Sequence, residues 1–443
     1  MESIISKAAL PLYEQFIADF ETRSALSSSE PEELSLLREK AFVAFQRLGF
    51  PTLKTEDWKY THLAPFLKEE FSTTPDDDID IKETILSKAS IKTLDGYKIV
   101  LVNGVYRPEF SDHPVDQGIF VSSLGSSYHK KAFATHFGKY TDASKNHFVA
   151  LNTALFRDGL FLEIKDKTIA ERPLHIVHFV SAKSNLFIQP RHLFVVGDQA
   201  QVSIIESYVS GDGDADIFVN NVSEIKIGAD SHVHHYYIQG GNARTRYIHH
   251  TEVNQSQKSV YNNYKASFPG VAFLRNNLNV ALNGENIESH LYGLYLAGGR
   301  QVVDNHTIVD HIKPNCQSNQ LYKGVMKEEA TGIFNGKIFV RKNAQKTNAF
   351  QKNNNLMLSN KAIVDSKPQL EIFADDVKCS HGSTVGQFNE DALFYLKSRG
   401  IGDERAKALL IHAFAYDVIE KMPLAPVKAW INKLIEEGLK PKL

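Results

Sequence analysis

The sequence predicts a mainly β protein whose long β-rich core lies between helical segments near the two ends of the chain. Roughly 230 residues beyond residue 150 show almost no helical period and instead carry a series of strand-like runs. Turn-then-strand units recur within this stretch, and each begins at a glycine. The units begin at Gly197 in GDQAQV, Gly228 in GADSHV and Gly284 in GENIESHL.

The recurring units are compatible with two β architectures. Gly197 and Gly228 are 31 residues apart, and weak internal similarity at such a spacing is typical of the stacked coils of a solenoid. A large antiparallel sandwich or barrel would give similar strand-rich runs, so periodicity alone leaves both folds open. Asparagines near the strands fit a solenoid, because stacked coils can place amide side chains in ladders. They are Asn262, Asn263, Asn276, Asn277, Asn279 and Asn353 to Asn355.

Residues 1–70 have helical character. Ser29 and Glu32 have the spacing of a capping box, and a face of apolar residues follows until Gly49 and Pro51 end the helix. In KTEDWKYTHL, Trp58 and Tyr60 are expected to pack this helical lobe against the next element. The acidic stretch 72–83 is a plausible linker. The face comprises Leu34, Leu37, Ala41, Phe45 and Leu48.

The β texture begins near residue 97. Two β-rich runs flank Asn103-Gly104, which is a strong hairpin signal, and a short helical insert is possible around 126–139. The end of the chain returns to helix, with segments expected at 389–399, 403–421 and 426–438. Asn389 and Asp403 are the predicted N-caps. The apolar faces of these helices must either dock on the β body or meet a partner.

Composition excludes several classes of protein. The 443 residues carry a formal net charge of −2, so no overall basic field would attract nucleic acid or a membrane surface. The first residues lack the apolar region of a secretory signal, and no apolar run is long enough to span a bilayer. Two cysteines in so long a chain argue against a disulfide framework. We therefore expect a soluble cytoplasmic protein. No P-loop motif is present, so no ATP site is expected in this chain.

The stretch CSHGSTVGQF, residues 379–388, carries the most suggestive chemistry. Cys379 and His381 are both ligands for a soft or borderline metal, and they could also form a nucleophile–base pair. One cysteine and one histidine cannot close a four-ligand site, which allows a site shared with another chain. A buried cysteine in a turn is the alternative. In an extended segment the two side chains project to the same side. Gly382 and Gly386 would let the backbone turn there towards the helices.

A second hypothesis uses the histidines. His232 and His234 would share one face of a strand, as in a cupin-like metalloenzyme, although the glutamate expected a few residues later is absent. We interpret the remaining scattered histidines as side chains satisfied by neighbours on a polar sheet face. These are His249, His250, His290, His306 and His311. The other cysteine, Cys316, is expected to be buried and inert.

Several segments resemble one known family in the same order. DVKCSHGSTVGQFNEDALFYLKSRGI (376–401) closely resembles the carboxy-terminal signature of the SufB/SufD family of iron–sulfur cluster assembly proteins. KTEDWKYTHL resembles its amino-terminal signature. HIKPNCQSNQLYKG and FNGKIFVRKNAQKTNAFQKNNNLML resemble its middle part. Gly382 and the Gly386-Gln387 pair look like the SufD branch of the family, and the low cysteine count agrees.

The resemblance implies a right-handed parallel β-helix core flanked by amino- and carboxy-terminal helical domains, which we assign to residues 1–96, 97–375 and 376–443. It implies a non-catalytic scaffold that pairs with SufB through the β-helix and binds the SufC ATPase through its carboxy-terminal helices. A transient Fe–S cluster would form at the interface with SufB, where Cys379 and His381 would supply half of a shared site. FADH2 in the complex, and a homodimer of the isolated chain, are further possibilities that the resemblance raises. The runner-up function is the metalloenzyme with His232 and His234.

Overall fold

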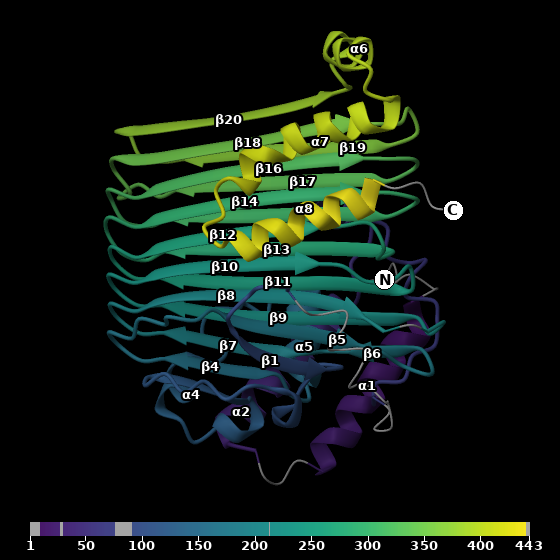
Figure 1. Ribbon diagram of the computed structural model, residues 1–443. Helices are drawn as coiled ribbons and strands as arrows, with labels where there is room; N and C mark the ends of the chain where they lie inside the picture. Colours follow the sequence, from purple (N-terminus) through teal and green to yellow (C-terminus); the bar gives the residue numbers. More distant parts are fainter. Residues whose placement is uncertain (1–8, 27–29, 76–90, 212, 440–443) are drawn as a thin grey trace.

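The computed structural model describes residues 9–26, 30–75, 91–211 and 213–439. Its body is a β-solenoid in which the chain passes alternately through two facing sheets (Figure 1). Sheet B has the strand order β2-β1-β5-β8-β10-β12-β14-β16-β18-β20. Sheet A has the order β19-β17-β15-β13-β11-β9-β7-β4-β3, with β6 paired to β9. The mainly β core between helical ends is therefore confirmed.

The bounds of the elements follow the order of the chain within the described residues. The helices are α1 (Leu10–Leu26), α2 (Glu32–Leu48), α4 (Lys131–His136), α5 (His147–Leu155), α6 (Glu390–Ser398), α7 (Asp403–Ile419) and α8 (Ala425–Leu439), with short 3-10 turns at Glu56–Trp58, Pro108–Phe110 and Gly125–Ser127. The first ten strands are β1 (Tyr97–Val102), β2 (Val105–Tyr106), β3 (Ile119–Ser123), β4 (Leu160–Ile164), β5 (Leu174–Val180), β6 (Leu186–Ile188), β7 (Arg191–Val196), β8 (Gln201–Ser210), β9 (Ile217–Ile227) and β10 (His232–Gln239). The others are β11 (Thr245–Gln255), β12 (Val260–Ser267), β13 (Phe273–Leu282), β14 (Glu288–Ala297), β15 (Val302–His311), β16 (Gln317–Met326), β17 (Thr331–Val340), β18 (Thr347–Met357), β19 (Ile363–Ile372) and β20 (Val377–Gly386).

Neighbouring strands of the core pair in parallel and in register. In sheet B, His232 of β10 has Val260 of β12 as its Cα partner, and Val260 has Glu288 of β14. Each of these partners lies one complete coil further along the chain, because the intervening residues cross through sheet A. This topology confirms the solenoid and excludes an antiparallel sandwich. In Figure 1 the strands of sheet B point to the right while the chain climbs towards β20, so the coil is right-handed.

One corner of the solenoid uses a residue with positive φ in successive coils. Gln199, for example, has a φ of 58° and donates its backbone N–H to the carbonyl of Ala229 in the next coil at 2.7 Å. The glycines that the sequence singled out come two positions earlier, where a Cβ would collide with the backbone of the preceding coil. These glycines are therefore required by the close approach of the coils. The corner residues are Lys167, Gln199, Asp230, Lys258, Asn286, Asn315 and Lys346.

The interior of the solenoid is apolar along most of its length, but it also encloses ionisable groups. The Glu206 carboxylate accepts hydrogen bonds from the Nε2 atoms of His178 and His235, each at 2.7 Å, and one from the Tyr208 hydroxyl at 3.1 Å. Burial by itself raises the pKa of Glu206, yet the two histidine contacts hold that pKa well below its usual value. Glu206 therefore stays ionised inside the protein.

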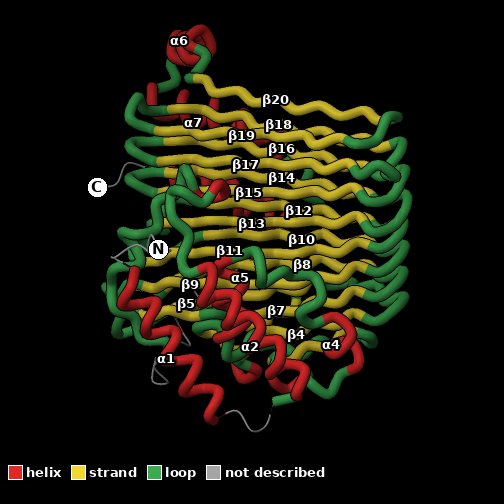
Figure 2. The backbone as a smooth tube through the Cα atoms, turned by 180° about the vertical axis from the view of Figure 1, so that it is seen from behind, coloured by secondary structure: helices red, strands yellow, loops and turns green. Residues whose placement is uncertain are grey.

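The amino-terminal helices cover the lower part of the outer face of sheet A (Figure 2). The contact is largely aromatic. Phe187 of β6 and Phe218 of β9 stack with ring centroids 4.7 Å apart, and Phe16 of α1 meets Phe187 edge-on at 4.9 Å. These strands carry aromatic residues on a face that would otherwise be solvated, because helices α1, α2 and α5 bury it.

The KTEDWKYTHL segment joins this amino-terminal part to sheet A. The Trp58 side chain is buried beneath the guanidinium of Arg275, whose central carbon lies 3.7 Å from the ring centroid. Arg275 donates to Asp304 Oδ2 at 2.7 Å, and Thr61 Oγ1 donates to the same oxygen at 2.7 Å. The predicted packing role of Trp58 is confirmed, whereas that of Tyr60 is wrong because its side chain is 44% exposed.

Other local predictions have mixed outcomes. The hairpin at Asn103-Gly104 is present between β1 and β2, although β1 also pairs in parallel with β5. The helical insert is present as α4, but α5 was not predicted, because its residues are nearly all buried and show no amphipathic period. Ser29 and residues 76–83 of the expected linker lie outside the described residues, and α2 has Pro31 as its N-cap.

Helices α7 and α8 pack on the outer face of sheet B and form part of the core (Figure 1). Ile411 and Val418 of α7, with Val427 and Ile431 of α8, are buried against residues of the strands such as Leu294. The apolar faces of these two helices therefore cover the β body, and the expectation that they form a docking surface for a partner is wrong for those faces. The structure favours the other alternative, docking on the body.

The caps of the carboxy-terminal helices agree in part with the sequence. Asn389 is the N-cap of α6, and its side chain accepts from the backbone N–H of Ala392. Asp403 was predicted as a cap but is the first residue of α7, which has Gly402 as its N-cap. An acidic residue in the first turn still interacts favourably with the helix dipole, which explains why either position suits an aspartate.

The interior also holds an ammonium group that makes the stability of the fold depend on pH. Lys265 of β12 is 3% exposed, and its Nζ lies 4.4 Å from the centroid of the Tyr237 ring. Burial lowers the pKa of Lys265 from its ordinary 10.5 to about 7. Between these two pKa values the unfolded chain holds a proton that the folded chain has lost, so the free energy of unfolding should rise as the pH increases from about 7 to 10.

We expect Lys265→Met to abolish this rise, which is at most about 1.4 kcal/mol per pH unit, and to increase stability at pH 7. Chemical denaturation of both proteins from pH 7 to pH 10 measures the effect. Lys183→Met, at an exposed position, is the matched control and should keep the wild-type slope. An unchanged slope in Lys265→Met would show that another group titrates.

Candidate functional site

Cys379 and His381 lie on β20, the last strand of sheet B. β20 pairs with β18 on one side and has no strand on its other side among the described residues. Because the segment is extended, the spacing of two residues places both side chains on the same face of the strand. Cys379 has Ala349 as its Cα partner, and His381 has Gln351. The pair therefore sits at the rim of the solenoid, above residues of the coil below.

Cys379 is the more enclosed member of the pair. Its side chain is half-buried and packs beside Ile338, Val340 and Ala349, which line the interior end of the solenoid. This burial raises the pKa of the Cys379 thiol above its usual value. The sulfur of the isolated chain is thus mostly protonated at neutral pH, and it would bind a metal as the thiolate, releasing its proton to solvent.

His381 is exposed, and the strand continues past it to Gly386. The expectation that Gly382 and Gly386 turn the backbone is wrong, because the parallel pairing with β18 holds both glycines in an extended strand. The turn towards α6 comes only after Gly386. A Cβ built on either glycine would meet no atom within 4 Å. The two glycines therefore leave open space beside the strand, into which a second chain could approach closely.

Polar groups continue from this rim into the solenoid, which the sequence did not predict. Ser383 Oγ donates to Ser366 Oγ of β19 at 2.9 Å, and Ser366 Oγ donates to Asn353 Oδ1 at 2.8 Å. Asn353 also receives the amide of Asn355 at 2.7 Å, and Tyr295 donates to Asn355 at 2.6 Å. The only signal was the run Asn353 to Asn355, which we interpreted as a ladder. The open end of the interior is thus hydrogen-bonded and polar near the rim.

The other cysteine and the H-x-H pair show different surroundings. Cys316 is fully buried, and its sulfur lies 3.2 Å from the Gly284 carbonyl, as expected for an inert thiol. His232 is exposed, whereas the His234 ring is partly buried beside the Tyr264 hydroxyl at 3.3 Å. Among the described residues, no group of three or more histidine, cysteine, aspartate or glutamate side chains could hold a metal ion. A mononuclear site at His232 and His234 would therefore need a ligand from elsewhere.

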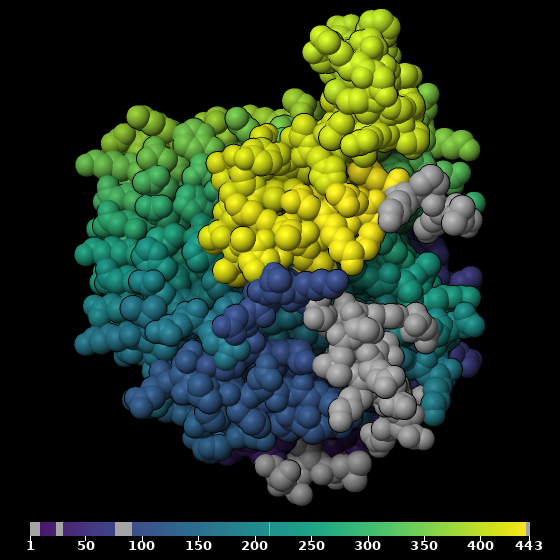
Figure 3. All heavy atoms as spheres, in the orientation of Figure 1, coloured from purple at the N-terminus to yellow at the C-terminus, as the bar shows by residue number. Residues whose placement is uncertain are grey.

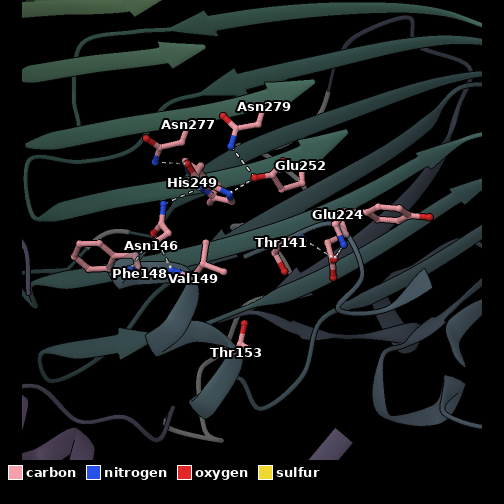
Figure 4. Close-up of polar contacts among 12 residues, drawn as sticks. Thr141, Asn146, Phe148, Val149, Thr153, Glu224, His249, Glu252, Asn277 and Asn279 are labelled. Atoms are coloured by element: carbon pink, nitrogen blue, oxygen red, sulfur yellow. Dashed lines mark hydrogen bonds and ion pairs between the residues drawn. The ribbon is translucent and has the colours of Figure 1, made fainter. Parts of the chain in front are cut away.

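Each of the scattered histidines has a partner, which agrees with our interpretation in part. His249 and His311 are fully buried, and one ring nitrogen of each has no partner among the described residues. On the outer face of sheet A, His250 Nε2 donates to Glu252 Oε1 at 2.8 Å. The amide of Asn279 donates to the same carboxylate at 2.7 Å (Figure 4). Asn146 caps α5 through its side-chain oxygen, while its amide nitrogen lies 3.5 Å from His250. This cluster therefore attaches α5 to the sheet. The others are His249 with Tyr237, His290 with Asn319, His306 with Asp304 and His311 with Ser318.

Glu224 anchors a loop on the same face. Its carboxylate accepts from the backbone N–H groups of Gly138 and Tyr140 and pairs with Arg191 at 2.6 Å. It also accepts from the backbone N–H of Thr141 (Figure 4). All of its acceptor capacity is used by the protein, so this buried carboxylate holds structure together and has no capacity for a ligand.

Comparison with known proteins gives the same family for both halves of the chain. Residues 179–414 match the family model described as "SUF system FeS cluster assembly, SufBD core domain", and residues 11–176 match the SufBD protein N-terminal region. An iron–sulfur cluster assembly SufBD family protein of Synechocystis is 30% identical over 95% of this chain and 98% of its own length. The iron–sulfur cluster assembly protein SufD of Escherichia coli is 31% identical over 85% of this chain and 86% of its own length. SufD of Bacillus subtilis is 27% identical over 93% and 95%. No helix in the described part of the chain combines the length and apolar character needed to cross a membrane.

The burial of the two thiols predicts their reactivity. We expect Cys379 to be alkylated by iodoacetamide more slowly than a free cysteine at pH 7.5, because its raised pKa leaves less thiolate, and Cys316 to react more slowly still. The Cys379 rate should increase as the pH rises above 9. Mass spectrometry of the labelled wild type and of Cys379→Ser assigns the two rates. A Cys379 that reacts faster than a free thiol would contradict the burial argument.

Proposed function

Because the chain belongs to the SufBD family of iron–sulfur cluster assembly proteins, we propose that it is the SufD-type scaffold subunit that pairs with SufB and the SufC ATPase. The single observation that carries the proposal is that Cys379 and His381 lie on the free edge strand of the solenoid. Relatives named SufD match over most of the chain, and the sequence has no P-loop of its own. A separate ATPase subunit would then supply the nucleotide chemistry.

The two ends of the solenoid differ in a way that supports pairing with SufB. At the amino-terminal end, β3 and β2 pair antiparallel with the first strands, and α4 packs beneath them. At the other end, β20 and β19 are edge strands with unpaired backbone groups. Apolar side chains are exposed there, namely Ile363 at 53%, Ile372 at 39%, Phe373 at 58% and Val385 at 51%. Free backbone donors and acceptors beside apolar side chains are what strand addition from a second chain requires.

A partner at this edge would complete the site. Cys379 and His381 supply one thiolate and one imidazole, which are both ligands that iron in a cluster accepts. The partner would bring the remaining ligands across the interface, and neither chain alone would hold the cluster tightly. That arrangement suits a cluster that is built and then passed on, so the Fe–S cluster is here the cargo of the complex.

The ATPase partner needs a different surface. Helix α6 stands clear of the body in the space-filling view (Figure 3). Its Phe394 and Tyr395 are 74% and 57% exposed, and Tyr416 of α7 is 60% exposed. Between α6 and the body lies a groove lined by Leu358, Phe388, Leu393 and Ala408 among others. We assign the SufC contact to this surface of α6 and the outer side of α7, since the apolar faces of α7 and α8 are already buried.

The remaining expectations stay predictions. These are the absence of catalysis in this chain, the association of FADH2 with the complex, the homodimer of the isolated chain and the division into domains at residues 96 and 375. The metalloenzyme alternative predicts that the isolated chain retains one metal ion per molecule through His232 and His234. Metal analysis of the purified chain therefore separates the two functions.

We expect His381→Ala to reduce Fe–S cluster formation in the reconstituted complex by about tenfold or more, because the site loses a ligand. The thermal unfolding midpoint and the yield of co-purified partners should stay close to wild type, since His381 is exposed. Cluster formation is followed by visible absorption and by iron and sulfide content. His129→Ala, an exposed histidine at the opposite end, is the matched control. Full cluster formation by His381→Ala would remove the proposed role.

A second prediction concerns the ATPase surface. Phe394→Glu should weaken capture of the ATPase by tenfold or more, because it places a charge in an apolar contact, and should leave folding unchanged at so exposed a position. Affinity is measured by pull-down and by titration calorimetry. Val43→Glu on α2, also an exposed apolar residue, should bind the ATPase as wild type does. Equal affinities for the two variants would place the contact elsewhere.

A further inference from the structure

Gln351 lies directly below His381 in the sheet. The two residues are Cα partners in the parallel pairing of β18 with β20, and neighbouring strands are about 4.8 Å apart. Parallel partners in register project to the same face, so the amide of Gln351 is on the same side of the sheet as the imidazole. Gln351 is 1% exposed, whereas His381 is exposed. The buried amide therefore forms the floor beneath the exposed ring.

The amide of Gln351 is held in one orientation. Its Nε2 donates to Gln320 Oε1 of β16 at 3.3 Å, and Thr307 Oγ1 donates to the same oxygen at 2.7 Å. The amide nitrogen of Gln351 is thus hydrogen-bonded to the coil below. Its Oε1, in contrast, is buried and has no hydrogen-bond partner among the described residues. A buried carbonyl without a hydrogen-bond donor costs about 1–3 kcal/mol. We therefore expect a donor to reach this oxygen in the assembled complex.

The opposite strand keeps room for this amide. Gly336 of β17 faces Gln351 across the interior, and a Cβ added to Gly336 would collide with the Gln351 amide nitrogen. An apolar side chain at position 351 would stabilise the interior more than glutamine does, because it would leave no buried oxygen unsatisfied. A glycine that clears space for a polar group with an unused acceptor is a costly arrangement for a merely structural residue.

We propose that Gln351 is a positioning residue for His381. In the assembled site its Oε1 accepts the N–H of the imidazole, which fixes one tautomer and turns the other ring nitrogen towards the cluster. A histidine that binds a metal usually donates its second N–H to a carbonyl or carboxylate, and loss of that partner typically costs 10–100-fold in affinity or activity. The inference rests on the proposed function of His381 and adds a residue on a neighbouring strand to the site.

The test uses the full-length chain assembled with its partners. Gln351→Met keeps the volume and removes the acceptor, Gln351→Asn keeps an amide that is too short to reach, and Gln351→Glu keeps an acceptor at the same distance. We expect the first two to lower cluster yield by about tenfold or more and Gln351→Glu to retain most of it. Gln239→Met, another fully buried interior glutamine, controls for the loss of an amide remote from β20.

A second measurement separates positioning from stability. Solid-state ¹⁵N spectra of the histidine-labelled complex, with the His381→Ala complex subtracted, report which ring nitrogen of His381 carries the proton. One tautomer is expected in the wild type and in Gln351→Glu, and a mixture in Gln351→Met. Wild-type yield with an unchanged tautomer in Gln351→Met would overturn the proposal, as would an equal effect of Gln239→Met. If His381→Ala also assembles clusters normally, the proposed function itself fails. If His381→Ala lowers the cluster yield but the Gln351 variants keep the wild-type yield and tautomer, only this inference fails.

Discussion

Parallel in-register pairing between successive coils is the constraint on which the rest of this structure depends. It fixes which residues lie above one another, because a residue and its partner one coil later share a face and a column. It brings the corners so close that only glycine fits at 197, 228 and 284. It also makes the stability of the body nearly a sum of contacts between neighbouring coils, as in other solenoids. A change at one coil is therefore felt mainly by the coils above and below it.

The solenoid has two ends, and they are covered differently. Antiparallel strands and helices close the amino-terminal end, and the aromatic contacts of α1 and α5 attach that cap to sheet A. The carboxy-terminal helices do not close the other end. Instead α7 and α8 lie along the side of sheet B, and only α6 projects beyond it. The free edge at β20 is thus a consequence of where these helices pack, and it leaves the strand with Cys379 and His381 accessible to a second chain.

The polar groups enclosed by the solenoid are costly, and several of them are satisfied by their neighbours. Glu206 is satisfied by two histidines and a tyrosine, so its charge can remain inside. Asn353 and Tyr295 belong to a closed network near the rim. Gln351 Oε1, like several other buried polar atoms, has no hydrogen-bond partner among the described residues. What sets Gln351 apart is its place directly beneath His381, the exposed residue of the proposed site.

The sequence by itself determined the helical ends, the β-rich core, the corner glycines, the hairpin at Asn103-Gly104 and the pair Cys379 and His381, because each of these is encoded in residues close together in the chain. The fold of the core stayed open between solenoid and sandwich until the family motifs were considered, since periodicity cannot show which strands pair. Only the tertiary structure decided that Trp58 lies under Arg275, that α7 and α8 cover sheet B, and that Gln351 lies under His381. Each of these contacts joins residues at least a full coil apart, and no local period or propensity reports which distant face a side chain will meet.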